Sequence, residues 1–317
     1  MNYVGIDISK ESFDVAIRKD EKYNHYKFSN DASGFKQFHK LLDKAVHWCL
    51  MEASGPYYQK LAMFLQAKEI TLSVINPLVI RRFCQMRLVK AKTDKKDAMM
   101  IAEYGKAEKP QAWKPDAAYL LELKQMQAYL EQLDKSRTGF IRQMEAFKQS
   151  PVINKEVKKG IAKMIKTTET QMQEVEQKME EIIRQYHEQM FEQVKSIPGV
   201  GKKTSLLLIV ISGGFTKFEN AKQLSSYVGL SPRIFESGTS VRGKVRICKM
   251  GMSRVRAMLY VCSWSAIKCN KACKELYQRL VEKGKAKQLA LIAVANKLIK
   301  QAFALATKGE FYKTEFI

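Results

Sequence analysis

The sequence predicts an α/β domain, followed by an antiparallel helical coiled-coil hairpin and a mainly helical C-terminal domain. Three observations support this fold class. Short runs of alternating apolar residues occupy the N-terminal part, heptad spacing is sustained across the middle, and helical periodicity dominates the rest. Pro110 and Pro115 mark the first boundary, so we expect domains at residues 1–109, 110–193 and 194–317.

Strands and helices alternate through residues 1–109. Runs of β-branched and aromatic residues predict strands at 3–8, 13–17, 23–28, 46–51 and 70–75. Helical spacing predicts helices at 31–44 and 56–67, and two more after Asn76-Pro77, the second of which begins near Thr93. The resulting order, β-β-β-α-β-α-β-α, is that of an RNase H-like α/β domain.

Two long heptad patterns, separated by Ser150-Pro151, fill most of residues 110–193. The first has seam positions at Tyr119, Leu123, Met126, Leu130, Leu133, Arg137, Phe140, Met144 and Phe147. The second has them at Ile161, Ile165, Thr168, Met172, Val175, Met179, Ile182 and Tyr186. This spacing predicts a coiled coil, and the short break predicts an antiparallel hairpin. An isolated hairpin leaves apolar surface uncovered, which favours a dimer; the alternative is a hairpin without a partner.

The last domain opens with a glycine turn, SIPGVG, which is followed by two lysines and an apolar helical run. Backbone N–H groups at such a helix N-terminus can approach a phosphate. The alternative is an ordinary connection between helices. Seven basic residues then lie between Tyr227 and Tyr260, interleaved with Gly238, Gly243 and Gly251. Glycine at these positions indicates backbone that comes close to another group.

We expect phosphate contacts from these basic side chains, with arginine favoured for bidentate binding. The alternative is mixed salt bridging on the surface. The predicted nucleic-acid-binding residues are Lys202, Lys203, Arg233, Arg242, Lys244, Arg246, Arg254 and Arg256.

The charge balance indicates a polyanionic partner. The chain has 55 Lys and Arg against 32 Asp and Glu, a formal net charge of +23. This favours nucleic acid over a membrane, because no run approaches the roughly 20 apolar residues that a spanning helix needs. The N-terminus has a strand pattern rather than a signal peptide, so we expect a cytoplasmic protein. None of the six cysteines forms a C-x-x-C pair, and reduced thiols are expected.

Four carboxylates are the candidate catalytic groups in this basic chain. Asp7 lies in an apolar strand, Glu52 ends another strand, and Asp94 and Asp97 are three apart at a helix start. Carboxylate oxygens are the preferred ligands of Mg²⁺, and two such ions can promote phosphoryl transfer. Each acid also has a structural alternative. Asp7 and Glu52 could face solvent, and T-D-K-K-D is a favourable helix N-terminus.

Long segments of the chain resemble a known family. VGIDISK, MEASGPYYQKL and VINPLVIRRFCQMRLVKAKTDKKDA look like the RuvC-like domain of the DEDD transposases of bacterial insertion sequences. These comprise the IS-one-ten group and the Piv-type DNA invertases. SIPGVGKKTSLLLI and YVGLSPRIFESGTSVRGKVRICKMGMSRVRAMLY resemble the second transposase domain of the same family. The resemblance covers essentially the whole chain in order.

The resemblance implies specific roles. The four acids of the family fall on Asp7, Glu52, Asp94 and Asp97, which would bind Mg²⁺. The nucleophilic serine of the family falls on Ser237, with Ser240 as the alternative. The resemblance also implies a bacterial host and a noncoding bridge RNA that guides recognition of donor and target DNA. It further implies dimers that pair into a tetramer.

The nucleophile segment FESGTSVRGK contains no histidine, so a Ser–His pair cannot form within it. Activation would have to come from a carboxylate-bound metal or from nearby Arg and Lys. Tyr260 is a rival nucleophile, but its LYVCSW setting indicates a buried helix. We therefore expect a recombinase that cuts and rejoins two DNA duplexes. The alternatives are a RuvC-like Holliday-junction nuclease and a nucleic-acid-binding protein without catalysis.

Overall fold

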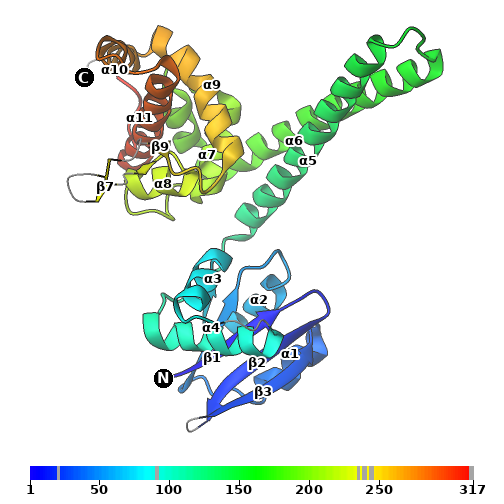
Figure 1. Ribbon diagram of the computed structural model, residues 1–317, viewed down its shortest axis with the longest axis vertical. Helices are drawn as coiled ribbons and strands as arrows, with labels where there is room; N and C mark the ends of the chain where they lie inside the picture. The colour runs from blue at the N-terminus through cyan, green and yellow to red at the C-terminus, as the bar shows by residue number, and fades with distance from the viewer. Residues whose placement is uncertain (20–21, 90–92, 234–235, 238–240, 243–245, 314–317) are drawn as a thin grey trace. The chain divides into compact units, whose positions relative to one another are not determined.

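The computed structural model describes residues 1–19, 22–89, 93–233, 236–237, 241–242 and 246–313. Contacts divide the chain into two compact units, Met1–Pro115 and Asp116–Ile317 (Figure 1). The predicted hairpin and the predicted C-terminal domain belong to the second unit together. The finer division into three domains stays a prediction.

The first unit is built on a five-stranded sheet in the order β3-β2-β1-β4-β5. The strands are β1 (Asn2–Ile8), β2 (Ser12–Lys19), β3 (Lys22–Ser29), β4 (His47–Glu52) and β5 (Thr71–Ile75). The first three pair antiparallel, whereas β1, β4 and β5 are parallel. All five predicted strands are therefore present, and the predicted α/β class is confirmed for this unit.

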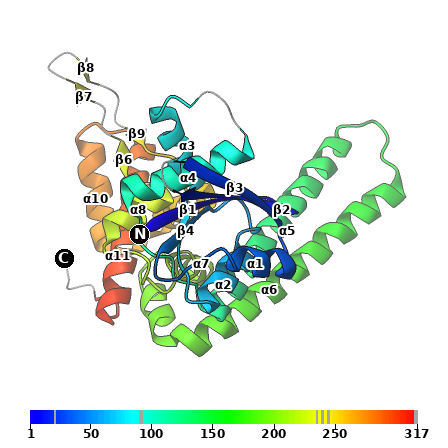
Figure 2. The same cartoon turned by 90° about the horizontal axis from the view of Figure 1, so that it is seen from below.

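Helices cover both faces of this sheet (Figure 2). The helices are α1 (Ala32–His39), α2 (Gln59–Ala67), α3 (Pro77–Met86) and α4 (Asp94–Glu108). Phe38 of α1 and Leu65 of α2 are buried in one core with Val4 and Ile6 of the sheet. On the other face Ile80 of α3 and Ile101 of α4 form a second core with Leu50 and Ile75. The face under α3 and α4 carries the candidate acids.

The helix expected at 31–44 is shorter than predicted and ends at His39. Its start is as expected, because the Gly34 N–H donates to Asp31 Oδ1 at 2.9 Å. Beyond His39 the N–H of Leu41 bonds the Phe38 carbonyl at 3.0 Å, which is a tight turn rather than a further helical turn. Leu41 is 39% exposed. The apolar pair Leu41-Leu42 extended the helical pattern, but the chain must turn here to enter β4.

The second unit begins with two long helices, α5 (Ala118–Lys148) and α6 (Lys155–Lys195), which lie side by side in Figure 1. The predicted break at Ser150-Pro151 separates them. Seam residues are buried on both helices, as the heptads predicted: Leu123, Leu130 and Leu133 on α5, and Ile161, Thr168 and Met179 on α6.

The predicted seam is wrong at its last position. Ile183 is fully buried, whereas Tyr186 is 52% exposed. The backbone of α6 leaves helical geometry at His187, where φ is −145°. His187 Nε2 lies 2.8 Å from the Tyr119 hydroxyl, and the Tyr119 and Tyr186 rings stack at 4.1 Å. The kink and this aromatic cluster shift the seam, because a strict heptad assumes an uninterrupted helix.

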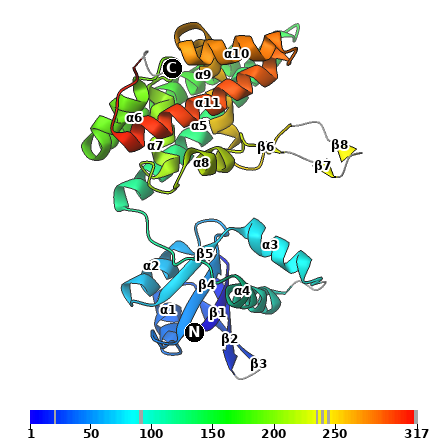
Figure 3. The same cartoon turned by 90° about the vertical axis from the view of Figure 1, so that its left-hand side faces the viewer.

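Five further helices complete the unit: α7 (Lys202–Ser212), α8 (Ala221–Val228), α9 (Ser253–Cys269), α10 (Lys271–Glu282) and α11 (Lys287–Lys308). Two short strand pairs lie between α8 and α9. One joins β6 (Pro232–Arg233) to β9 (Arg246–Ile247), and the other joins β7 (Glu236–Ser237) to β8 (Val241–Arg242). Figure 3 shows β7 and β8 beyond β6, away from the helices of this unit.

By length and composition α11 is a helix that could cross a membrane, with a mean hydropathy of 1.5. By this measure the expectation that no run approaches a spanning helix does not hold for α11. In the structure α11 contacts α6, α8, α9 and α10, and nine of its residues are buried. Such a helix is the core helix of the unit, which explains its apolar composition without a membrane.

Candidate active site and nucleic-acid interface

Two of the predicted acids occupy neighbouring positions on adjacent parallel strands. The register of β1 with β4 pairs Gly5 with Leu50 and Ile6 with Met51. Asp7 and Glu52 follow directly, one residue beyond the last pair. Both side chains are half-buried. Because alternate residues of a strand point to the same face, Asp7 lies on the Gly5 face, which is the face that α4 covers.

Helix α4 delivers the other two acids, and a glycine allows it to do so. A Cβ atom at Gly5 would collide with the carbonyl oxygen of Ala98 and would lie 2.5 Å from the Ala102 nitrogen. The absence of a side chain therefore lets α4 rest directly on β1. Thr93 caps the helix by accepting the Lys96 N–H at 3.3 Å, which leaves Asp94 and Asp97 in its first turn.

The pKa of Asp7 indicates that the four acids lie near one another. Burial contributes most, the carboxylates of Asp97, Asp94, Glu52 and Asp14 follow in that order, and together they raise the pKa of Asp7 to about 6. An acid surrounded by like charges favours its protonated form. The structure thus brings together the four residues that the sequence analysis selected, on one face of the sheet.

The donor set fits a hard divalent cation. The four side chains offer carboxylate oxygens, and their mutual repulsion is what a bound cation would relieve. As placed, no group of three or more His, Cys, Asp or Glu side chains is close enough to hold a metal ion within the described part of the chain. The arrangement is therefore an acidic patch of the right chemistry, without an assembled coordination shell.

A fifth carboxylate of this face was missed by the sequence analysis. Asp14 of β2 is the register partner of Asp7 and is only 6% exposed. His25 Nε2 lies 2.8 Å from its Oδ1 and Lys27 Nζ lies 3.6 Å from its Oδ2. This imidazole contact lacks the geometry of an aligned hydrogen bond. An Asp between Phe13 and Val15 in an alternating strand was the available signal, since a buried carboxylate needs a partner.

The predicted serine lies in the short strand pair of the second unit. Ser237 belongs to β7, where its backbone pairs with Val241 of β8. Ser240, Lys244 and the glycines Gly238 and Gly243 lie outside the described residues. The choice of nucleophile therefore stays a prediction. Tyr260, the rival, lies within α9 as expected, but its side chain is half-buried rather than buried, and Val261 beside it is exposed.

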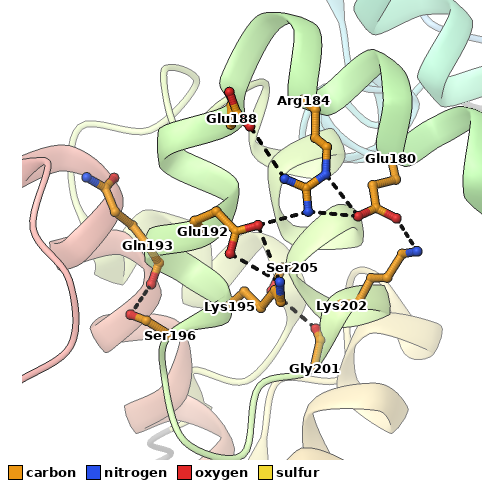
Figure 4. A network of polar contacts seen from close by, with 10 residues as sticks. All are labelled: Glu180, Arg184, Glu188, Glu192, Gln193, Lys195, Ser196, Gly201, Lys202 and Ser205. Atoms are coloured by element: carbon orange, nitrogen blue, oxygen red, sulfur yellow. Dashed lines mark hydrogen bonds and ion pairs between the residues drawn. The ribbon is translucent and has the colours of Figure 1, made fainter.

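The lysines after the glycine turn have partners within the protein (Figure 4). Lys202 forms an ion pair with Glu180 of α6, and Lys203 lies 2.7 Å from Glu176. The Arg184 guanidinium contacts Glu180 at 3.0 Å and Glu192 at 2.9 Å, which completes a network around the start of α7. Hydrogen bonds from Lys202 and Arg184 lower the pKa of Glu180. These contacts join α6 to α7, so the two lysines have a structural role.

The glycines of the second unit also serve close packing. Gly199, at φ +96°, lies against Ala266 of α9, where a Cβ atom would be 2.7 Å from the Ala266 Cα. Gly251, at φ +116°, is packed against the Tyr227 backbone carbonyl. At these two positions the close approach that the sequence predicted is to the protein's own backbone.

The predicted arginines divide into two groups. Arg256 donates to the Val228 carbonyl at 2.9 Å and so completes the end of α8, and Arg254 lies 3.4 Å from Asp134 of α5. Arg233 is exposed on β6. Arg242 and Arg246 lie on β8 and β9. Arg254 and Arg256 thus contact other elements of the unit, and the assignment of the strand-pair arginines to nucleic acid stays a prediction.

All six cysteines are free thiols, as expected. Cys84 of α3 lies on the acidic face, and its pKa is raised by burial and by the carboxylates of Asp97 and Glu52.

Two family models match the chain. Residues 4–149 match the DEDD transposase model of IS110, described as transposase. Residues 192–278 match the model of the transposase IS116/IS110/IS902 family. The first match spans the first unit and α5 of the second, and it includes all four candidate acids; the second match lies within the second unit.

Relatives match over nearly the whole chain. The pilin gene-inverting protein of Moraxella lacunata is 29% identical over 319 residues, which cover 96% of this chain and 95% of that protein. The protein of the same name from Moraxella bovis is also 29% identical. The transposase for insertion sequence element IS1111A of Coxiella burnetii is 23% identical and covers 98% of this chain.

Proposed function

Because this chain belongs to the IS110 family of transposases, a family of DNA transposition and recombination enzymes, we propose that it cuts and rejoins two DNA duplexes through a metal-binding carboxylate site and a transient phosphoserine link. The convergence of Asp7, Glu52, Asp94 and Asp97 carries the proposal, through the raised pKa of Asp7. The strand order of the first unit supports a RuvC-like domain. The names of the relatives, a gene-inverting protein and transposases, support the rejoining of DNA.

The four acids would hold Mg²⁺, which would supply positive charge against the developing charge on the transferred phosphoryl group. The residues of this chain set the conditions for that binding. Gly5 fixes the approach of α4, Thr93 caps the helix, and the parallel pairing of β1 with β4 aligns Asp7 with Glu52. Neither Asp7 nor Glu52 requires a second copy, because both belong to one sheet.

The serine step conserves the energy of the cleaved bond. Ser237 Oγ would attack a backbone phosphorus, so that an O–P bond forms while the bond to the leaving deoxyribose oxygen breaks, and the leaving oxygen takes up the proton. Attack by a strand hydroxyl from the second duplex would reverse these changes and release the serine. Without a serine the same acids would support hydrolysis, as in the junction-nuclease alternative.

Guidance by a noncoding bridge RNA and assembly of dimers into a tetramer complete the proposal. The net charge of +23 suits binding to both RNA and DNA. The distal part of the hairpin supports self-association. The fully buried residues of α5 end at Leu133, whereas Phe140, Met144 and Phe147 are only half-buried. A second hairpin would cover these side chains.

A DNA inversion assay with purified protein, its bound RNA and a two-site plasmid tests the function. Asp97→Asn and Ser237→Ala should each abolish inversion, while DNA binding persists. Asp31→Asn is the matched control for the acid, because Asp31 caps α1 and is not among the acids that raise the pKa of Asp7. Ser240→Ala is the reciprocal variant, because Ser240 is the alternative nucleophile: loss of inversion in this variant alone would assign the role to Ser240.

The outcomes separate the alternatives. Cleavage that persists in Ser237→Ala without rejoining indicates the junction nuclease, and inversion at the normal rate in this variant excludes Ser237 as the nucleophile. Normal inversion in Asp97→Asn indicates that this acid serves only the helix start. RNA sequencing of the purified protein tests the guide, and an RNA transcribed beside the gene is the expected result.

A further inference from the structure

The outward face of α11 changes from apolar to basic along its length. Leu289 in the first turn is 44% exposed, although the opposite face of the helix is buried in the core. Residues three and four apart share a helix face, so the stripe continues through successive turns. Its members, none of them buried, are Leu289, Ile292, Ala293, Asn296, Lys297 and Lys300.

Two adjoining cavities follow this stripe. The first has a volume of about 540 Å³ and lies between α11 and the base of the β6–β9 pair, where Leu230, Pro232 and Ile247 form its apolar wall. The second has a volume of about 560 Å³, lies between α10 and α11, and is lined by Arg279, Lys297 and Lys300. Ala293 and Asn296 line both cavities, so the two form one groove.

The polar groups that line the groove are donors. Asn296 Oδ1 accepts a hydrogen bond from Ser225 Oγ at 3.0 Å, and Gln301 Oε1 accepts one from Asn270 Nδ2 at 3.1 Å. Ser225 and Asn270 are 2% and 1% exposed. The amide oxygens are therefore engaged inside the unit, which leaves the amide N–H groups for a ligand.

The charged groups that line the groove are all cations. Arg279, Lys297 and Lys300 line it together with Lys249, and no Asp or Glu is among the described residues that line either cavity. Within the described ranges, none of these four cations has an acidic partner within ion-pairing distance. The stretch from 271 to 308 contains nine Lys and Arg against two Glu. A groove that offers donors and cations selects an anionic ligand.

We propose that this groove holds a short length of single-stranded DNA, with an unstacked base in the apolar cavity and backbone phosphates on Lys297, Lys300 and Arg279. Cavities of this size admit a base but not a duplex. From Leu289 to Lys300 the helix rises about 16 Å, a length that a few nucleotides of single-stranded DNA span. Apolar walls accept any base because every base has an apolar face.

The position of the groove favours DNA over another occupant. β6 and β9, which form its apolar wall, flank the segment that carries Ser237 and Ser240. The inference rests on the proposed function at this point, because the groove adjoins the strand pair that flanks the serine segment in the chain. A second copy of this chain would also fill an apolar cavity, but its net charge of +23 opposes docking on a groove lined by cations.

Fluorescence anisotropy of the full-length protein tests the proposal with three probes of one sequence: single-stranded DNA, single-stranded RNA and duplex DNA. The double variant Lys297→Gln/Lys300→Gln should lower the salt slope for single-stranded DNA by about 1.4, at about 0.7 per phosphate contact. Its matched control is Lys283→Gln/Lys285→Gln, which removes two exposed charges nearby that do not line the groove.

A second variant, Ala293→Met, fills the groove without a change in charge. It should weaken single-strand binding about fivefold or more and leave the salt slope unchanged. A strand that contains 4-thiothymidine should photocrosslink to peptides of residues 287–300. Circular dichroism of each variant confirms that the fold is retained.

Each result bears on the inference. Equal effects of the groove and control variants, equal loss of duplex binding, or an effect confined to RNA would each overturn it. A change of oligomeric mass with unchanged binding would assign the groove to a second copy instead. If the unmodified protein binds none of the three probes, the proposed function itself fails, which is a separate outcome.

Discussion

Replacement of Asp7 by Asn should stabilise the metal-free protein and abolish its activity. Burial and the neighbouring acids raise the pKa of Asp7 from 3.8 to about 6. A tenfold change in an ionisation constant is worth about 1.4 kcal/mol. At neutral pH the ionised Asp7 therefore lowers the free energy of unfolding by up to about 3 kcal/mol. Because Asp7 is partly exposed, which reduces the effect, we expect Asp7→Asn to raise the free energy of unfolding by about 1 to 3 kcal/mol.

The sign follows from the raised pKa. Between pH 4 and pH 6 the folded state binds this proton more tightly than the unfolded state, so stability falls as pH rises through this window. Asp7→Asn should not show this fall in stability with rising pH. The difference between the two proteins should be small near pH 4 and full above pH 6.

Hydrogen exchange of the full-length protein in EDTA measures the effect locally. Amides of β1 and β4 should exchange about 5- to 150-fold more slowly in Asp7→Asn at pH 7.5, which is the expected free energy as a ratio. Added Mg²⁺ should then slow exchange in the unmodified protein and have little effect in the variant. Faster exchange in the variant, or a difference that is independent of pH, would refute the argument that the four acids repel one another.

Three further substitutions test the packing that positions the sites. Gly5→Ala should destabilise the first unit by about 1 to 3 kcal/mol and lower activity, because the new Cβ meets the Ala98 carbonyl. Its control is Gly139→Ala on α5, where a Cβ meets open space. The control should slightly stabilise the protein, measured as slower hydrogen exchange of α5. Leu88, at φ +54° and 81% exposed, ends α3 in a conformation that favours glycine, so Leu88→Gly should raise stability to urea by about 1 kcal/mol. Asn270→Ala should cost about 2 to 3 kcal/mol in calorimetry of the second unit, because it removes the buried cap of α10. An unchanged melting profile in the last variant would contradict the importance of that cap.

Much of the architecture is predictable because it depends on local periodicity. The alternation of Val4, Ile6 and Ile8 determines which face of β1 packs against α1 and α2. Pro151 lies in the break between the two long heptad patterns, as its sequence position predicts. The errors occur where a tertiary contact overrides the pattern. The stack of Tyr119 on Tyr186, with the kink at His187, moves the seam of α6, and no window of sequence contains both partners.

The candidate acids lie near one another in the fold, and the reason that they meet is tertiary. The sequence by itself determined the residue types, the basic composition, and the strand ends and helix start on which the acids lie. Only the fold decided that Gly5 lets α4 rest on β1, that Asp14 is a fifth acid beside them, and that Lys202 and Lys203 are paired with glutamates of α6. Periodicity acts within a few residues, whereas charge pairing and close packing depend on distances in space between residues that are far apart in the chain.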